Sequence, residues 1–304
     1  MPSAPASLLI ELKTAIDNFA AQTNLFESKN FELRAEAADF IDFHIIDRID
    51  GSWLDVDKRL EALREEAEHL KMTFDEIDNT LFTELRQQVA DTNTDPQRFI
   101  ELVCNNVNLN IDANNRESKM GYDILDLFID GLLFTCPLPE STAPLQPDMV
   151  FYQKTPARIV FEMAKRAKLR TNEVFFDIGS GLGQATILMN LITGANTVGI
   201  EFDEALYAYS LQCAQALQLS KVSFTHANAL EFDYSSGDVF FLYTPFKYEM
   251  LKQMLQKLKA EAVKRTIRIF TYGPCSPVIG HEDWLACTNG LPDDIYRLYE
   301  FTSV

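Results

Sequence analysis

The strongest structural signal in the sequence is Val174-Phe-Phe-Asp-Ile-Gly-Ser-Gly-Leu-Gly-Gln184. Its first five residues are mostly aromatic or branched and apolar, which is typical of a short buried strand. Glycines follow at positions 179, 181 and 183, where they let the backbone turn sharply and approach a ligand closely. A helical stretch from Gln184 to Ile192 comes next, and the N–H groups of its first turn are free. We therefore predict a strand, a ligand-binding turn and a helix.

The alternation of strand and helix continues along the second half of the chain. Further strands are expected at 197–200, 222–225, 239–242 and 267–271, and further helices at 203–217 and 246–263. Such alternation predicts right-handed crossovers and a parallel sheet. Residues 284–287 and 295–302 resemble strands that form an antiparallel pair at one edge. We predict an α/β fold with a Rossmann-like, mostly parallel sheet and an antiparallel edge.

The first half of the chain reads as helices throughout. Apolar residues recur at helical spacing in 7–21, 32–46 and 54–89, and shorter helices are expected at 96–103 and 122–134. Four prolines then exclude a helix over residues 136–148, because proline removes a backbone donor and disfavours the helical region before it. We therefore predict an all-α domain over residues 1–148 and the sheet domain over residues 149–304.

Charge is distributed unevenly between the halves. The formal net charge is −18, and residues 1–150 hold 29 acidic and 12 basic residues, against 16 and 15 in residues 151–304. An acidic protein repels phosphate backbones, so we expect no direct binding of nucleic acid. The acidic half is interpreted either as solvated helix faces that keep the protein soluble, or as a surface that steers a basic partner.

Neither metal-binding patterns nor targeting segments are found in the sequence. The five cysteines are scattered with no Cys-x-x-Cys pair, and the four histidines are isolated, so we expect no metal site and no disulfide framework. No apolar run approaches the length that spans a bilayer, and the first residues lack the pattern of a secretory signal. A cytoplasmic protein that does not bind membranes is the resulting expectation.

Two acidic residues indicate which class of ligand the glycine turn binds. Asp177 ends the first strand, where its carboxylate can hold an ammonium group and would repel a pyrophosphate. Gln184 stands where a dinucleotide-binding fingerprint needs its last glycine. Glu201 ends the second strand, where an acid accepts hydrogen bonds from both ribose hydroxyls. The pattern favours an adenosyl ligand with an amino-acid moiety over the nicotinamide dinucleotide of a dehydrogenase.

These residues resemble the first two motifs of class I S-adenosylmethionine-dependent methyltransferases. The order Asp-x-Gly-Ser-Gly-x-Gly-Gln from Asp177 to Gln184 is similar to that of the Dot-type (non-SET) histone lysine methyltransferases. Upstream, Tyr152 and Thr155 match the Tyr-Gly-Glu-Thr segment with which that family lines its cofactor, whereas the two residues between them do not. The resemblance covers roughly residues 150–272 and implies S-adenosylmethionine as cofactor and methyl transfer (EC 2.1.1.-) as reaction.

The ends of the third and fourth strands supply further candidates. Asn228, followed by Ala229, stands where class I enzymes often place an Asp that accepts from the adenine amino group. Tyr243, Thr244 and Phe246 stand where residues beside the transferred methyl are expected. The Dot type has two Asn before this Phe, so the chain departs from the family pattern here. Tyr243 would position an acceptor and Phe246 would form a wall of its pocket.

The candidates divide into two groups. The catalytic group is Tyr243, Thr244 and Phe246; the cofactor-binding group is Tyr152, Thr155, Asp177, Gly179, Ser180, Gly181, Gly183, Gln184, Glu201, Asn228 and Ala229. Because no residue stands out as a general base, we expect catalysis by proximity and desolvation. The acceptor is either a basic protein, through lysine N-methylation, or a small molecule beneath a helical lid. A module that binds the cofactor without catalysis is the remaining alternative.

Overall fold

The computed structural model describes residues 6–51, 57–91, 95–109, 121–142, 147–170 and 172–304. The start of the helix expected from residue 54 and the proline at 144 lie outside these ranges. None of the described helices has the length and apolar character needed to cross a membrane.

The second half of the chain forms the predicted sheet. It has seven strands in the order β3-β2-β1-β4-β5-β7-β6. The first five are parallel, whereas β7 is antiparallel to both β5 and β6. The strands are β1 (Val174–Ile178), β2 (Asn196–Glu201), β3 (Val222–His226), β4 (Val239–Leu242), β5 (Arg268–Thr271), β6 (Leu285–Cys287) and β7 (Tyr299–Ser303). The Rossmann-like sheet with an antiparallel edge is therefore confirmed.

One strand begins later than predicted. We expected a strand over residues 295–302, but β7 begins at Tyr299. The preceding residues form a turn, in which the Asp294 backbone N–H donates to the Tyr299 hydroxyl at 3.0 Å and the Arg297 N–H donates to the Asp294 carbonyl. The Asp294 side chain also accepts the Tyr296 N–H at 2.8 Å, and such a local side-chain bond to the backbone competes with the strand.

Helices cover both faces of the sheet, as alternate residues of its strands show. On one face, Phe175 and Phe241 share a buried core with α7 (Ala157–Ala167), α8 (Gln184–Thr193) and α9 (Glu204–Ala216). On the other, Phe176 and Phe240 pack with α10 (Tyr248–Ala262) and α11 (Cys275–Ile279). Successive side chains of a strand point to opposite faces, so a strand buried on both sides feeds two cores. Sequence analysis missed α7 and α11.

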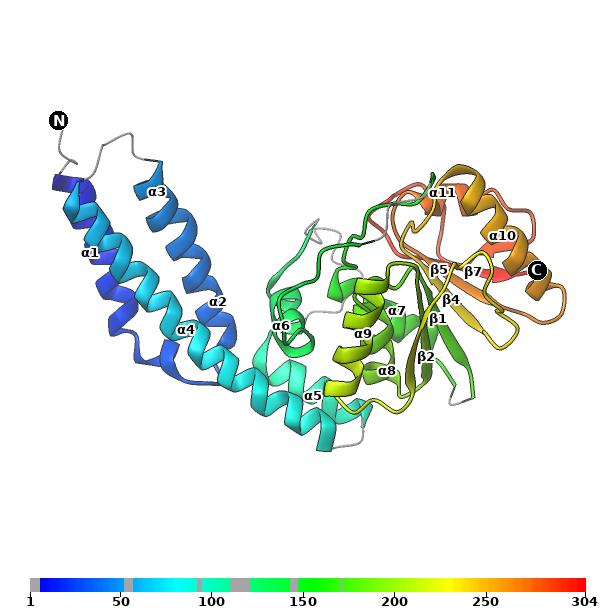
Figure 1. Ribbon diagram of the computed structural model, residues 1–304, viewed down its shortest axis with the longest axis horizontal. Coiled ribbons are helices and arrows are strands. Elements are labelled where there is room, and N and C mark those ends of the chain that lie inside the picture. The colour runs from blue at the N-terminus through cyan, green and yellow to red at the C-terminus, as the bar shows by residue number, and fades with distance from the viewer. Residues whose placement is uncertain (1–5, 52–56, 92–94, 110–120, 143–146, 171) are drawn as a thin grey trace.

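The first half is helical, as predicted. Its elements are α1 (Ala6–Ala21), η1 (Thr23–Phe26), α2 (Phe31–Phe40), the π-helical η2 (Ile41–Ile46), α3 (Asp47–Asp50), α4 (Lys58–Asp91), α5 (Pro96–Asn106) and α6 (Ile124–Leu133). Helix α4 has 34 residues and is therefore about 51 Å long. In Figure 1, α1, α2, α3 and the first part of α4 project away from the sheet. We call residues 6–74 the arm.

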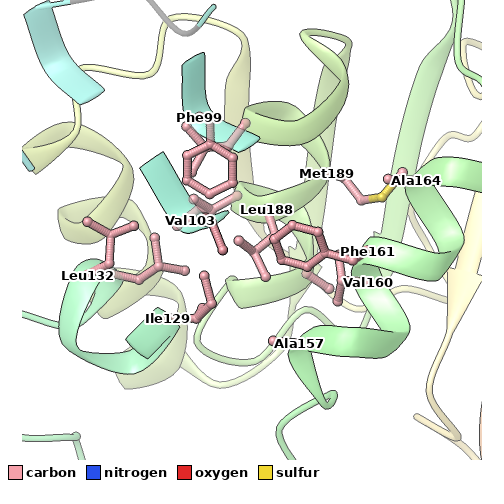
Figure 2. Close-up of a cluster of buried hydrophobic side chains, with 14 of the residues drawn as sticks. Phe99, Val103, Ile129, Leu132, Ala157, Val160, Phe161, Ala164, Leu188 and Met189 are labelled. Carbon is pink, nitrogen blue, oxygen red and sulfur yellow. The ribbon is translucent and has the colours of Figure 1, made fainter. Parts of the chain in front are cut away.

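Packing does not divide the chain at residue 148. The arm has a core of its own, whose members lie between Leu12 and Phe74. Helices α5 and α6 instead belong to the core of the sheet domain. Figure 2 shows this core with residues of α5, α6, α7 and α8 in one cluster: Phe99, Val103, Ile129, Leu132, Ala157, Val160, Phe161, Leu188 and Met189. The proline-rich segment therefore marks the change in secondary structure and charge. The two cores separate within α4 and within α2, since Phe31 and Ala35 at the start of α2 belong to the core of the sheet domain.

Candidate active site

The glycine turn between β1 and α8 is shaped by its backbone conformation. Gly179, Gly181 and Gly183 all have positive φ, at 77°, 53° and 80°, a region that L-residues rarely adopt. A Cβ on Gly181 would lie 2.0 Å from the ring of Tyr152, and one on Gly183 would lie 2.5 Å from the ring of Phe224. Both the conformation and the space therefore require glycine at these positions.

A pocket opens beside this turn, at the carboxyl ends of the parallel strands, where open α/β sheets bind their ligands. It encloses about 1060 Å³ of empty space, part of it open to solvent. Most of the predicted site residues line it: Tyr152, Thr155, Asp177, Gly179, Ser180, Gln184, Glu201, Ala229, Tyr243, Thr244 and Phe246. The described part of the chain contributes no lining residue before Ser141.

Buried polar atoms without partners point to a ligand in this pocket. Gln184 is 2% exposed, and neither its Oε1 nor its Nε2 has a hydrogen-bond partner among the described residues; the same holds for Ser180 Oγ. Leaving such a group buried and unpaired costs about 1–3 kcal/mol. Because Gln184 and Ser180 line the pocket, a polar ligand bound there can satisfy them. The pocket therefore fits a ligand with several hydrogen-bonding groups.

Asp177 is the buried acid of the turn. Its Oδ2 accepts a hydrogen bond from Thr186 Oγ1 at 2.8 Å. Burial raises the pKa of Asp177 to about 7, and the nearby charge of Glu201 acts in the same direction, whereas the Thr186 hydrogen bond opposes the rise. An ammonium group in the pocket would favour the ionised carboxylate. Asp177 thus suits the amino group of an amino-acid moiety.

Glu201, at the end of β2, is held by the backbone around it. Its Oε2 accepts from the Gly181 N–H at 2.7 Å, and its Oε1 accepts from the N–H groups of Phe202 and Asp203 at 2.8 Å each. Burial raises the pKa of Glu201, although these bonds lower it. A carboxylate has about four acceptor positions, so Oε2 keeps one for a ribose hydroxyl. The predicted bonds from Glu201 to both ribose hydroxyls stay a prediction.

Asp203, two residues after Glu201, was not predicted as a site residue. Its Oδ1 caps α9 by accepting from the Ala205 N–H at 2.8 Å. Its Oδ2 accepts from Ser141 Oγ at 2.7 Å and from the Thr142 N–H at 2.8 Å. Asp203 therefore fixes a segment about 60 residues earlier in sequence against the pocket, which Ser141 lines. The sequence signal for this residue is that an Asp precedes a helical pattern, which indicates an N-cap.

The segment that contains Tyr152 and Thr155 is held in place by α6. The buried Asp126 of that helix accepts the Ala157 N–H at 2.7 Å and so caps α7, which has no side-chain cap of its own. Lys154 forms an ion pair with Asp130 of α6. These contacts explain why α6 packs with the sheet domain, because it positions one wall of the pocket.

Asn228 and Ala229 occupy different environments. Ala229 is buried and lines the pocket. Asn228 is half-buried, and its Oδ1 accepts the Leu230 N–H at 3.0 Å while its Nδ2 donates to Glu231 at 3.2 Å. The pocket lining includes the residues on either side of Asn228 and omits Asn228 itself. Its side chain thus has a local turn-forming role, and its predicted bond to an adenine stays a prediction.

The end of β4 forms the opposite wall of the pocket. Thr244 is buried with φ at 45°, an unfavourable value for a β-branched residue. Its Oγ1 donates to the Tyr272 carbonyl at 3.3 Å and accepts from the Cys275 N–H at 3.1 Å. The Tyr243 hydroxyl donates to Gln153 Oε1 at 3.4 Å. Thr244 therefore ties β4 to β5 and presents Tyr243 to the pocket.

The titratable side chains that line the pocket are carboxylates and tyrosines. Its carboxylates are Asp177, Glu201 and Asp203, and it has no lining histidine among the described residues. Burial raises the pKa of Tyr243 to about 12, so this hydroxyl stays protonated at neutral pH. No group of three metal-binding side chains lies together in the described ranges. The site is arranged to bind and orient its ligands.

Comparison with known proteins gives one family match. Residues 148–262 match the family described as histone methylation protein DOT1, a segment that includes the glycine turn and the pocket from Met149 to Phe246. No curated protein matches the chain.

Solved structures resemble about half of the chain at low identity. An RNA methyltransferase from Salinibacter ruber in complex with S-adenosyl-L-homocysteine is 22% identical, covers 50% of this chain and 92% of its own, and has a TM-score of 0.37. A SAM-dependent methyltransferase from Aquifex aeolicus is 15% identical, covers 47% of this chain and 88% of its own, and has a TM-score of 0.38. Magnesium protoporphyrin IX methyltransferase from Synechocystis PCC 6803 with bound SAM is 16% identical, covers 48% of this chain and 76% of its own, and has a TM-score of 0.37.

The family match and the geometry of the pocket agree. The matched segment contains the positive-φ glycines, the buried Asp177 and the unpartnered Gln184, in the Asp-x-Gly-Ser-Gly-x-Gly-Gln order of the Dot-type branch. These are the features that an S-adenosylmethionine site needs: room at the turn, an acid for the ammonium group and unpaired polar atoms for the rest. The family match and the pocket together support an S-adenosylmethionine-dependent methyltransferase, in which residues 148–262 are similar to the histone methylation protein DOT1 family.

Proposed function

We propose that the protein methylates a lysine amine of a basic protein. The observation that carries this proposal is the match of residues 148–262 to a histone methylation family in a chain with a strongly acidic first half. A histone-like acceptor is rich in Lys and Arg, and complementary charge accelerates association and selects partners. The cytoplasmic location of the protein itself, inferred from its cysteine usage, stays a prediction.

Different residues of the pocket have different roles in methyl transfer. Bound S-adenosylmethionine supplies a methyl group on a cationic sulfur, which an amine can attack in line. Asp177 and Glu201 hold the two ends of the cofactor, and Gln184 pairs with its polar groups. Tyr243 orients the amine by its hydroxyl, while Phe246, which is 5% exposed, excludes water from the reacting atoms.

The amine must be neutral when it attacks, and an apolar wall favours that state. Desolvation lowers the pKa of an amine because it disfavours the charged form. Met149, Pro245 and Phe246 supply such a wall on the Tyr243 side of the pocket. The three carboxylates of the lining are already engaged with backbone or hydroxyl donors. We therefore assign the rate enhancement to alignment and desolvation, with no general base.

The position of the arm supports a large acceptor. A lid over a small molecule would contribute residues to the pocket, but no described residue before Ser141 lines it. In Figure 1 the arm extends away from the sheet domain. An acidic surface at a distance from the pocket suits an acceptor that contacts both, which favours a protein over a small molecule.

The test is transfer of labelled methyl groups to purified core histones, followed by identification of the modified atom by mass spectrometry. We expect methyl-lysine, with a rate that falls as ionic strength rises, because screening weakens steered association. An acidic protein of similar size and free L-lysine serve as control acceptors. Turnover of free lysine that equals turnover of histones would contradict the proposal. Cofactor binding without transfer to any acceptor would favour the non-catalytic alternative.

A further inference from the structure

Gln153 and Tyr243 meet across the pocket. Both line it, and the Tyr243 hydroxyl donates to Gln153 Oε1 at 3.4 Å, although the two residues lie 90 positions apart in sequence. Gln153 belongs to the segment that α6 holds in place, and Tyr243 belongs to the opposite wall at the end of β4. Each lies in a motif where the chain departs from the Dot-type pattern. The two departures are therefore joined by one contact.

Lys154, the other unmatched residue of the Tyr152 segment, is held outside the pocket. Its ammonium pairs with Asp130 and lies 4.8 Å from the centre of the Tyr122 ring, and the pocket lining omits it. A lysine ammonium directed into the pocket would repel a cationic acceptor. Of the two unmatched residues, Gln153 is therefore the one in a position to act on a bound substrate.

Two contacts fix the position of the Tyr243 side chain. Its ring packs against the ring of Tyr272, with the centroids 5.0 Å apart and the planes at 54°, and Tyr272 is itself only 3% exposed. Its hydroxyl is held by Gln153. A side chain that is held at both its ring and its hydroxyl loses little conformational freedom when a substrate binds. Such preorganisation suits a group that orients a reacting atom.

The hydrogen bond to Gln153 also determines what the Tyr243 hydroxyl offers a substrate. A phenol has one proton to donate and two lone pairs that accept. Burial raises the pKa of Tyr243 to about 12, so the proton is present at neutral pH, and it is donated to Gln153 Oε1. The hydroxyl oxygen therefore faces a substrate as an acceptor, and the group that matches it is an N–H.

The neighbouring hydroxyl at the end of β4 is committed to the backbone. Thr244 Oγ1 donates to the Tyr272 carbonyl and accepts from the Cys275 N–H. Its proton and a lone pair are therefore used to join β4 to β5. Of the two hydroxyls at this strand end, that of Tyr243 is the one available to an acceptor.

We propose that Gln153 is a positioning residue for the acceptor, an inference that rests on the proposed function. Gln153 holds the proton of Tyr243, so that the phenol oxygen accepts a hydrogen bond from an N–H of the neutral lysine amine. An amine held in this way keeps its lone pair free to form the bond to the methyl carbon while the bond from that carbon to sulfur breaks. The methylated ammonium then loses a proton to solvent. Gln153 thus acts on the acceptor through Tyr243 and has no part in holding the cofactor.

The experiment is a double-mutant cycle of Gln153→Met and Tyr243→Phe, with steady-state methylation of core histones by the full chain as the measurement. Methionine keeps the length of the glutamine side chain without its amide, and phenylalanine removes the hydroxyl alone. Gln256→Met is the matched control, because Gln256 is an exposed residue of α10 outside the pocket lining. Calorimetric titration of each variant with S-adenosylmethionine shows whether the pocket is intact.

We expect kcat for histones to fall about tenfold in Tyr243→Phe and about fivefold in Gln153→Met. The affinity for S-adenosylmethionine should stay within about twofold of the wild type, and Gln256→Met should behave as the wild type. The double variant should lose no more than Tyr243→Phe, because Gln153 acts through the hydroxyl that this variant lacks.

A kcat of Gln153→Met equal to that of the wild type would overturn the inference and leave the proposed function intact. Losses that multiply to about fiftyfold in the double variant would also overturn it, because they would show that the two residues act independently. Failure of the proposed function is seen in the wild type alone, as an absence of histone methylation, and would overturn the inference with it.

Discussion

Two buried polar side chains, one in the arm and one in the pocket, show how differently the two regions are built. Arg34 is completely buried in the arm, where it pairs with Asp78 at 2.6 Å and donates to the carbonyls of Leu25 and Ser28 at 3.1 and 2.9 Å. Gln184 is equally buried in the pocket and has no partner for either polar atom. The buried polar groups of Arg34 have their partners within the protein, whereas those of Gln184 can gain partners only from a bound ligand.

This contrast separates structural from functional roles. A buried charge that is fully hydrogen-bonded fixes a single packing arrangement. A buried amide without partners costs free energy that only a bound molecule can recover. Changes in the arm should therefore alter stability or association with an acceptor, and changes in the glycine turn should alter cofactor binding.

The largest effect is expected for Gly181→Ala. The added Cβ would overlap the ring of Tyr152, and the φ of 53° strains any L-residue. We expect the affinity for S-adenosylmethionine to fall at least about 100-fold, equivalent to about 3 kcal/mol, in titration calorimetry. Gly121→Ala is the control, since Gly121 has a φ of 107° but no atom within 4 Å of an added Cβ. Similar losses of cofactor affinity in both variants would contradict the steric explanation.

The next effect concerns the ion pair that joins Arg34 of the arm to Asp78, a residue of α4 just beyond the arm. Arg34→Met leaves the carboxylate of Asp78, which is 18% exposed, without its partner, and breaking such a pair costs about 3–5 kcal/mol. We expect scanning calorimetry to show a lower unfolding temperature for the arm. The affinity for S-adenosylmethionine should remain within about twofold of the wild type, because the arm core and the pocket share no residue. A parallel loss of cofactor affinity would show that the two regions are coupled.

The smallest effect should follow removal of charge from the arm. Glu36, Asp39, Glu61 and Glu65 are exposed acids of α2 and α4, and their combined replacement by Gln or Asn removes four negative charges. We expect KM for core histones to rise about three- to tenfold at low salt, because steering is weaker, with kcat unchanged. The difference should vanish at about 1 M salt, where the Debye length is about 3 Å. A KM difference that persists there would exclude steering as its cause.

Local patterns explain what could be predicted from the sequence. The glycine turn joins β1 directly to α8, so its residues are neighbours in both sequence and space, and the order of strands and helices determined the sheet. Most of the candidate residues consequently line one pocket. The carboxyl ends of parallel strands meet at one edge, which brings together Asp177, Glu201 and Tyr243 from three strands.

Long-range contacts explain what could not be predicted. The bond from Ser141 to Asp203 spans 62 residues and that from Ala157 to Asp126 spans 31, and neither residue pair carries a motif. Helix α7 was not predicted, although its apolar residues recur at helical spacing.

Asp177 also makes cofactor binding depend on pH. Its folded pKa of about 7 lies above the ordinary value of 3.8, so the folded protein retains a proton that the unfolded chain loses. The stability of the unliganded protein should therefore fall as pH rises from about 4 to about 7. The cofactor ammonium favours the ionised carboxylate, so affinity should rise as pH passes upward through 7.

The most direct test of the account is titration of S-adenosylmethionine into the wild type and Asp177→Ala between about pH 6 and pH 8, with Asp233→Ala, an exposed acid, as control. We predict that the wild type binds and gains affinity with rising pH. Asp177→Ala should lose at least about 100-fold in affinity together with that pH dependence, while Asp233→Ala should behave as the wild type. Equal affinity of the wild type and Asp177→Ala would contradict the assignment of this pocket as the cofactor site.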